Sequence, residues 1–216
     1  MKASDLFVKC LENEEVEYIF GVPGEENEDL MISLMDSKIK FIATRHEQGA
    51  AFMAAAYGRL TGKAGVCLST LGPGAMNLTT GLADAHLGNM PVVAITGQVG
   101  LHRFHKQNFQ FIDVVGTFRP ITKWNTSITT PFVIPEAVRK AFKIAEVERP
   151  GVTHLELPED VAKKDVEAEP LQRTKVRRPG ADSGAIEQAV NLIRNAKNPL
   201  ILAGNGCIRE KVSKQL

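Results

Sequence analysis

Residues 65–97 read GVCLSTLGPGAMNLTTGLADAHLGNMPVVAITG, and this stretch decides the fold. Two short apolar runs, 65–70 and 91–97, are rich in β-branched residues and predict buried strands. Between them, residues 75–87 have the apolar spacing of a helix. A strand, a helix and a second buried strand in this order predict a βαβ unit with parallel strands.

The same alternation continues on both sides of this unit. Short apolar runs bounded by Gly, Pro or polar residues alternate with longer stretches of helical period. Strands that alternate with helices predict a parallel sheet, and uninterrupted apolar strands predict burial on both of its faces. We therefore expect an α/β fold in which a parallel sheet is flanked by helices. The further strands expected are 16–22, 40–44 and 151–157, and the further helices are 4–14, 26–36, 47–61 and 135–147.

The composition is typical of a globular protein, with 44% hydrophobic and 24% charged residues among 216. A formal net charge of +1 gives no basic field that would attract nucleic acid or an anionic membrane, so we expect neither partner. No apolar run of 18 residues predicts a membrane span, and the amphipathic start does not resemble a signal peptide. Cys10, Cys67 and Cys207 are far apart and lack metal-ligand spacing, which favours a reduced, cytoplasmic setting and no metal site on this chain.

A change in composition near residue 162 predicts a domain boundary. We assign residues 1–161 to one domain and the charged, Pro- and Gly-containing residues 162–184 to an exposed linker. Beyond the linker follow a helical pattern, the strand-like run PLILAGNG (199–206) and the start of another helix. Such a segment cannot bury enough apolar surface to fold alone. We therefore expect residues 185–216 to be the beginning of a truncated central α/β domain.

Glu47 is the first candidate functional residue, because it lies where a predicted strand turns into an alanine-rich helix. Thr44 and Glu47 have the spacing of a capping box, in which the carboxylate accepts a hydrogen bond from a free backbone N–H group. A carboxylate at the carboxyl end of a strand in an α/β sheet is also where ligand sites form. From the pattern alone, both interpretations stay open.

Two glycine-containing turns are further candidates. Residues 71–77, LGPGAMN, form a loop between a strand and a helix, where backbone N–H groups can face a ligand. The loop lacks the Gly-Lys-Ser/Thr and GxGxxG patterns that would predict phosphate or dinucleotide binding. Residues 21–24, GVPG, form a tight turn after the first strand, where glycine allows close approach of another group.

Four segments together resemble a known family. They are IFGVPGEENEDL (19–30), RHEQGAAFMAAAYGRLTGK (45–63), residues 65–99 and FQFIDVVGTFRPITKWN (109–125). In this order they are similar to the acetolactate synthases and related thiamine-diphosphate enzymes, and the likeness covers roughly residues 1–160. The resemblance implies that residues 1–161 are the pyrimidine-binding domain of such an enzyme.

The resemblance also implies roles for individual residues. Glu47 would hydrogen-bond the ring nitrogen N1′ of the aminopyrimidine and so favour the imino form that takes the C2 proton of the thiazolium. Gln110 would be a second catalytic residue that contacts substrate or cofactor. The residues implied to bind the cofactor are Val22, Pro23, Gly24, Glu47, Thr70, Gly72, Pro73 and Asn77.

The implied reaction is decarboxylation of pyruvate and carboligation to a second 2-oxo acid, as in branched-chain amino acid biosynthesis. The family binds Mg²⁺ through a carboxyl-terminal domain whose motif these residues lack, so we expect this chain alone to be inactive. FAD is a further candidate cofactor, since Gly204–Asn205–Gly206 resembles the opening of a middle domain that holds FAD in some members. Family members form their site between subunits, which implies a homodimer or homotetramer of the complete protein.

Departures from the family pattern leave alternatives open. Phe111 stands where the biosynthetic enzymes often carry an acidic residue, and catabolic enzymes tend to have His-Gln in place of Phe109–Gln110, so the subfamily is open. Another thiamine-diphosphate decarboxylase or oxidase is one alternative function. A non-enzymatic nucleotide-binding module with the same α/β layers is another, because a fold does not determine a function.

Overall fold

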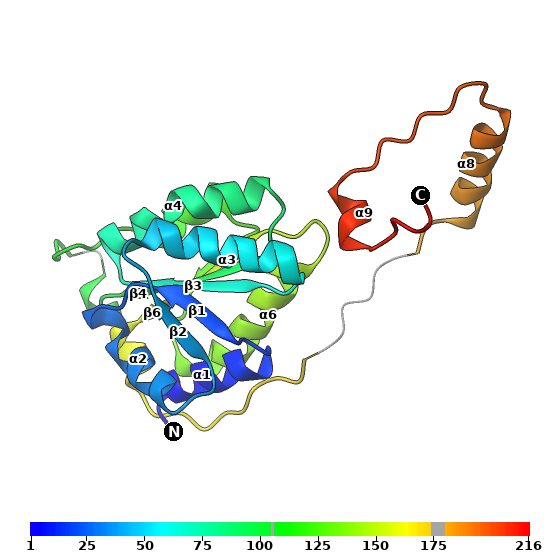
Figure 1. The fold of residues 1–216 in the computed structure, drawn as a ribbon. Helices are drawn as coiled ribbons and strands as arrows, with labels where there is room; N and C mark the ends of the chain where they lie inside the picture. Colours follow the sequence, from blue (N-terminus) through cyan, green and yellow to red (C-terminus); the bar gives the residue numbers. More distant parts are fainter. Residues whose placement is uncertain (105, 174–179) are drawn as a thin grey trace. The chain divides into compact units, whose positions relative to one another are not determined.

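A computed structural model describes residues 1–104, 106–173 and 180–216 of the chain (Figure 1). The chain divides into two compact units, Met1–Thr174 and Lys175–Leu216. Among the described residues, no helix is both long and apolar enough to cross a bilayer.

The first unit is built on a six-stranded sheet whose paired strands all run parallel, in the order β2-β1-β3-β4-β6-β5. This confirms the expected α/β fold. The central strands β3, β4 and β6 are buried along their whole length, as uninterrupted apolar runs predict. The strands are β1 Tyr18–Gly21, β2 Lys40–Ala43, β3 Gly65–Ser69, β4 Val92–Gln98, β5 Trp124–Ser127 and β6 Val152–Pro158.

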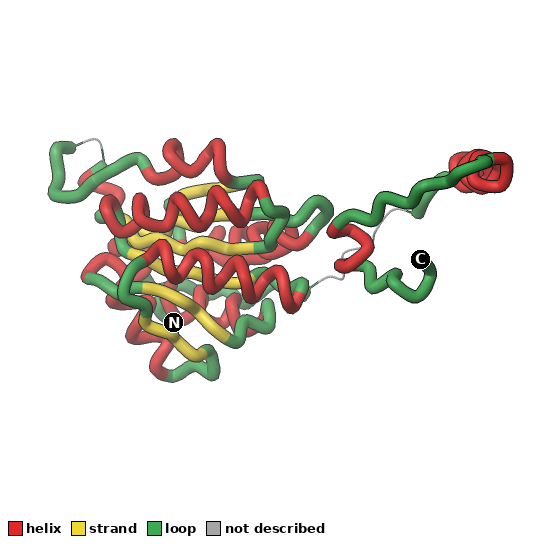
Figure 2. Tube along the Cα trace, turned by 45° about the horizontal axis from the view of Figure 1, so that its top comes forward, coloured by secondary structure: helices red, strands yellow, loops and turns green. Residues whose placement is uncertain are grey.

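Helices cover both faces of this sheet (Figure 2). One apolar core lies under α1 Ala3–Asn13, α2 Glu28–Met35 and α6 Ile134–Glu146, and the other lies under α3 Glu47–Thr61, α4 Gly72–Leu87 and α5 Val114–Phe118. The five predicted helices therefore occur with small shifts at their ends. The shorter elements are α7 Glu159–Ala162, η1 Glu25–Asn27, η2 Leu101–Arg103, η3 Arg119–Ile121 and η4 Pro131–Val133.

The segment 71–77 is not a loop, which corrects the sequence interpretation. Helix α4 begins at Gly72, directly after β3, with Leu71 as its N-cap residue. Gly72 has a φ of +47°, which glycine adopts without strain, and Pro73 occupies the first turn, where its missing N–H group costs nothing. Asn77 is therefore fixed on a helix rather than carried by a flexible turn.

Helix α3 packs unusually close to its neighbours because its inner residues are small. Ala50, Ala51 and Ala54 are fully buried. A Cβ atom added at Gly81 of α4 would lie 2.6 Å from the Cβ of Ala51, and one added at Gly58 would lie 2.2 Å from the carbonyl oxygen of Pro91. Backbone and Cβ atoms, rather than long side chains, thus set the position of α3.

His154 on β6 is a completely buried polar residue in this unit. Its Nε2 lies 2.9 Å from Oγ1 of Thr96 on the neighbouring strand β4, and its ring packs edge-on against Phe118 with centroids 4.7 Å apart. Burial lowers the pKa of His154 to about 3, because the charged imidazolium would lose its hydration. The ring is therefore neutral in the folded state near neutral pH.

We expect this neutral histidine to make the protein less stable in acid. The folded-state pKa lies below the unfolded value, so its contribution is fully present above about pH 6.5 and is lost as the pH falls towards 3. The free energy of unfolding should fall by about 1.4 kcal/mol per pH unit within this window because of His154 alone. The measurement is chemical denaturation of the wild type and His154→Gln at pH 7, 6 and 5. The two stabilities should converge as the pH falls, and parallel pH profiles would contradict the prediction.

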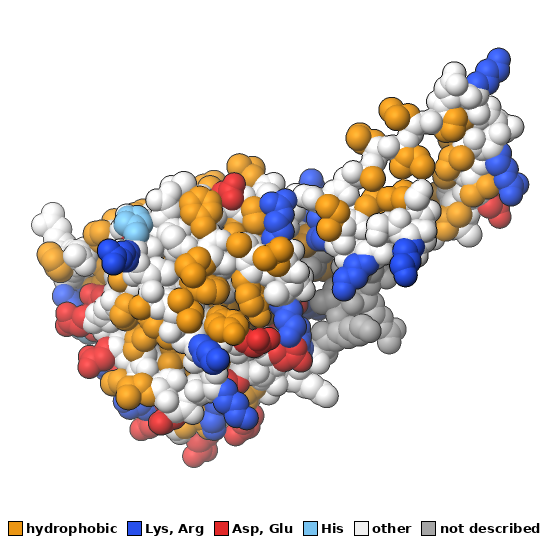
Figure 3. All heavy atoms as spheres, viewed as in Figure 1, with side chains coloured by type: hydrophobic (Ala, Val, Ile, Leu, Met, Phe, Trp, Pro, Cys, Tyr) orange, Lys and Arg blue, Asp and Glu red, His pale blue; other side chains and the backbone are white. Residues whose placement is uncertain are grey.

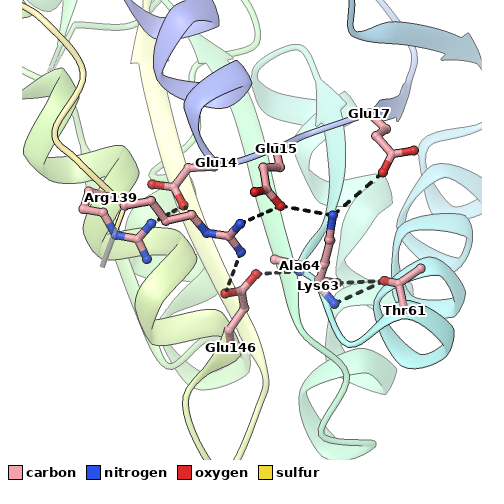
Figure 4. A network of polar contacts seen from close by, with 9 residues as sticks. Glu14, Glu15, Glu17, Thr61, Lys63, Ala64, Arg139 and Glu146 are labelled. Atoms are coloured by element: carbon pink, nitrogen blue, oxygen red, sulfur yellow. Dashed lines mark hydrogen bonds and ion pairs between the residues drawn. The ribbon is translucent and has the colours of Figure 1, made fainter. Parts of the chain in front are cut away.

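A network of ion pairs joins α1, α6 and the end of the first unit (Figure 4). Glu14 follows α1, its side chain is 2% exposed, and its carboxylate pairs with Arg139 of α6. Burial raises the pKa of Glu14, and the charges of Arg139 and Arg173 oppose this shift. Arg173 also lies 2.7 Å from Glu15 and 3.9 Å from Glu146. The network therefore connects three segments that are distant in sequence.

The first part of the segment predicted as an exposed linker, 162–184, lies on the first unit instead. Val166 is buried, its N–H group donates to the carbonyl of Met1, and Asn13 donates to the carbonyl of Leu171. The prediction of exposure is wrong here because this part of the chain contacts the unit through isolated residues. Isolated contacts produce no apolar pattern of helical or strand period in the sequence. Residues 174–179 of the segment lie outside the described residues.

The second unit contains α8 Ser183–Asn195 and α9 Asn205–Arg209 in its described part. The strand expected at 199–206 does not form within this part. Leu200 and Leu202 are 92% and 94% exposed, and a strand needs a partner to satisfy its backbone groups. The assignment of residues 185–216 to the beginning of a central domain stays a prediction.

Candidate functional site

The candidate site lies at the carboxyl ends of β1 and β3, which are neighbours in the sheet. The chain leaves β1 through α2 towards β2 on one side, and it leaves β3 through α4 towards β4 on the other side. Connections that diverge in this way open a crevice at the carboxyl ends of the strands, where open α/β sheets bind ligands. The topology therefore predicts that a ligand site includes the residues that follow Gly21 and Ser69.

Glu47 is the first residue of α3, directly after the turn that leaves β2. The N-cap residue of this helix is His46, whose Nδ1 accepts a hydrogen bond from the Gln48 N–H group at 3.1 Å. Thr44 instead donates to the carbonyl oxygens of Gly21 and His46. The capping box inferred from the spacing of Thr44 and Glu47 is thus wrong. Because His46 performs the capping, the Glu47 carboxylate is left available for other contacts.

The Glu47 carboxylate is half-buried and is held by α4. Its Oε2 accepts a hydrogen bond from Nδ2 of Asn77 at 3.0 Å. Its Oε1 lies 3.2 Å from where a Cβ atom would be at Gly74, so only a glycine there leaves this space open. Among the described residues, Oε1 has no hydrogen-bond partner. One oxygen is thus fixed and the other is free to accept a proton donor.

Thr70 lies between the turn after β1 and the start of α4. A Cβ atom at Gly24 would lie 2.1 Å from Cγ2 of Thr70, and one at Gly74 would lie 2.7 Å from its Oγ1. Contacts therefore run continuously from Gly24 through Thr70 and Gly74 to Glu47 and Asn77. Gly74 is not among the predicted cofactor-binding residues, although the candidate segment 71–77 contains it.

The remaining predicted residues border this set. Val22 continues the pairing of β1, since its N–H group donates to the carbonyl of Leu68 at 3.2 Å, and Pro23 after it is exposed. Pro73 is exposed in the first turn of α4. Gln110 has a φ of +58°, and its carbonyl oxygen lies 2.1 Å from where a Cβ atom would be at Gly72. The backbone of Gln110 therefore lies against the start of α4, and its side chain is exposed.

The described residues contain no group of three or more His, Cys, Asp or Glu side chains that could hold a metal ion. The candidate site consists of a carboxylate beside an amide, with Gly24, Thr70 and Gly74 next to them. Such an arrangement can accept a hydrogen bond from a ring N–H group and orient a planar ligand.

Comparison with known proteins identifies the family of this chain. Residues 1–117 match the family model described as thiamine pyrophosphate enzyme, N-terminal TPP binding domain. The chain is 44% identical over its whole length to a probable acetolactate synthase large subunit of Methanocaldococcus jannaschii, of which it covers 38%. It is 42% identical, over 93% of its length, to a catabolic acetolactate synthase of Raoultella terrigena, of which it covers 36%.

A third relative is the acetolactate synthase large subunit of Corynebacterium glutamicum, with 38% identity over the whole chain and 35% of the relative covered. The chain thus spans little more than a third of the length of these relatives. The matched residues include the turn after β1, Glu47, Thr70, Asn77 and Gln110. The chain belongs to the thiamine pyrophosphate enzymes, and its first unit contains their N-terminal, cofactor-binding domain.

Proposed function

We propose that this chain is the cofactor-activating part of an acetolactate synthase, which decarboxylates pyruvate and joins the product to a second 2-oxo acid. The names of the similar proteins support this assignment. Because the chain spans only part of their length, the reaction belongs to the whole protein. The residues proposed for this chain's share of the work are Glu47 and Gln110 as catalytic residues and Val22, Pro23, Gly24, Thr70, Gly72, Pro73 and Asn77 as cofactor contacts.

The observation that carries the proposal is the Glu47 carboxylate, with one oxygen held by Asn77 and the other open. Thiamine diphosphate fits this group, because the N1′ atom of its protonated pyrimidine would donate a hydrogen bond to Oε1. A hydrogen bond with an ionised partner is worth about 1.5–3 kcal/mol, more than a neutral one. When bound, thiamine diphosphate supplies the electron sink for decarboxylation. Glu47 holds the proton at N1′, and Asn77 fixes the direction from which the carboxylate acts.

The other proposed contacts rest on the close packing around Thr70 and Gly72. Gly24 and Gly74 keep the space beside Thr70 free of side chains, which lets a flat ring lie against the backbone. Gln110 extends from a segment whose backbone lies on Gly72, so we propose that its exposed amide contacts the 2-oxo acid substrate. Mg²⁺, and FAD if the protein uses it, would be bound by residues beyond those of this site.

We propose a homodimer or homotetramer for the whole protein. Apolar side chains gather on the side of the first unit where α3 and the strands β1 and β2 lie (Figure 3). Phe52 and Met53 are 41% and 42% exposed, and Leu60 and Leu87 are 86% and 82% exposed. Exposed apolar patches of this kind commonly mark protein interfaces.

The three cysteines are free thiols, which supports a reducing, cytoplasmic location.

The test is product analysis of the full-length protein with pyruvate, with and without thiamine diphosphate and Mg²⁺. Acetolactate and carbon dioxide should form only when both are present, and added FAD shows whether it is also required. Acetaldehyde or an oxidised product without acetolactate would instead identify a decarboxylase or an oxidase. Binding of a nucleotide, without binding of thiamine diphosphate, would identify a nucleotide-binding module and overturn the proposal.

A further inference from the structure

A buried pair of side chains, Gln98 and Glu156, lies behind the candidate site and takes no part in it. Gln98 ends β4 and is 1% exposed, and Glu156 lies on the adjacent strand β6 and is 2% exposed. Nε2 of Gln98 donates to Oε2 of Glu156 at 3.0 Å. A buried carboxylate is costly unless it is hydrogen-bonded, so a pair of this kind calls for an explanation.

The remaining bonds of Gln98 connect the two ends of one segment. Its Oε1 accepts a hydrogen bond from the N–H group of Val99, which begins the segment after β4. Its Nε2 also donates to the carbonyl of Ile112, which ends the segment just before α5. A single amide thus satisfies backbone groups thirteen positions apart, while Glu156 fixes the orientation of that amide.

The segment that Gln98 closes is the one that carries Gln110. Ile112 is two residues beyond Gln110, and the Gln110 carbonyl lies directly against Gly72. The far side of the segment is held separately, since the N–H groups of Gly100 and Leu101 donate to Glu159 and Asp160. Among the described residues, the hydrogen bond to Ile112 therefore anchors the end nearest to Gln110.

We propose that Gln98 and Glu156 are positioning residues, which hold the 106–112 end of this segment so that Gln110 lies at the carboxyl ends of β1 and β3. The role of Gln110 in this inference rests on the proposed function. The anchoring of residues 106–112 rests only on the hydrogen bonds of Gln98. Glu156 is 2% exposed and acts through Gln98 in this proposal. Burial raises the pKa of its carboxyl group, and the bond from Gln98 opposes that shift.

The first measurement is amide hydrogen exchange of residues 106–112 in the full-length protein. We expect faster exchange in Gln98→Met/Glu156→Met, a paired change that leaves neither side chain of the pair with an unmatched polar group. The conservative variant Glu156→Gln should retain slow exchange, because its amide oxygen can still accept from Gln98. Thr153→Val is the matched control: it removes one buried hydrogen bond, to the carbonyl of Ala141, from the same strand. Unchanged exchange in the paired variant would overturn the anchoring.

The second measurement is a double-mutant cycle on kcat/KM for pyruvate. The paired variant and Gln110→Ala should each lower kcat/KM, the paired variant by about 10- to 100-fold because a shift of about 1 Å has effects of that size. Combining them should add little to the loss from Gln110→Ala alone, since both act through the same side chain. Losses that multiply would overturn the proposed link. Failure of the proposed function is distinguishable, because the wild type would then form no acetolactate from pyruvate, whereas the exchange measurement does not depend on activity. If only the role of Gln110 is wrong, Gln110→Ala keeps wild-type kinetics.

Discussion

Replacing Glu47 by glutamine in the full-length protein is expected to lower turnover by about 10²- to 10⁴-fold, the usual contribution of a positioned acid or base. The hydrogen bond at 3.0 Å from Asn77 explains why an amide cannot substitute. Asn77 donates, so the oxygen of the new amide would turn towards it. The amide NH₂ group would then face the proton donor of the bound ring, and two donors would meet.

The fold should not change in this variant, because the bond to Asn77 and the His46 cap of α3 both remain. The measurement is the steady-state rate of acetolactate formation, together with thermal unfolding of each protein. Glu28→Gln, an exposed change in the first turn of α2, is the matched control and should retain full turnover. Near-normal turnover in Glu47→Gln would contradict the proposed function, and a large loss of stability would contradict the site geometry.

The largest expected effect on stability comes from Arg139→Leu. Among the described residues, this change leaves the buried Glu14 carboxylate with the more distant Arg173, at 3.8 Å, as its remaining ion-pair partner. Removing one member of a buried ion pair costs about 3–5 kcal/mol, because the remaining charge is no longer compensated. We expect a loss of about 3 kcal/mol in the free energy of unfolding, since Arg173 supplies part of the compensation. Urea denaturation at pH 7 measures it.

A double variant distinguishes a lost ion pair from lost packing. Glu14→Leu/Arg139→Leu removes both charges and keeps apolar volume, so it should recover most of the stability that Arg139→Leu loses. Arg173→Leu should cost less than Arg139→Leu, because the Arg173 side chain is 30% exposed and that of Arg139 is 11% exposed. If the double variant is no more stable than Arg139→Leu, the loss comes from packing and the electrostatic explanation is wrong.

The buried half of the fold could be predicted because its signals are local. β3, β4 and β6 are continuous apolar runs between glycines and prolines, and each was expected within one or two residues of its observed position. β5 was missed because Trp124–Ser127 forms an edge strand of partly buried residues, three of them polar. This strand has no apolar run to reveal it, since its side chains are only partly buried.

The residues of the candidate site could be named from the sequence, but their geometry could not. The spacing of Thr44 and Glu47 gave the wrong cap, because His46 can also accept a backbone hydrogen bond and lies nearer to the helix start. The bond between Glu47 and Asn77 spans 30 residues, and no local pattern encodes it. Gln98 and Glu156 were not considered, since an isolated Gln and an isolated Glu in apolar strands give no sign that they meet.

The close packing of α3 has a consequence for laboratory evolution of this enzyme. Because α3 rests on backbone and Cβ atoms, a larger side chain at Gly58 or Gly81 cannot be accommodated by a change of rotamer in its neighbours. A variant library should therefore tolerate almost no substitution at these two glycines. Gly49 lies in the first turn of α3 and has open space around it, so it should accept larger residues. Diversity intended to reshape substrate choice is therefore best directed to the exposed side of α3, and the small residues beneath it are best left unchanged.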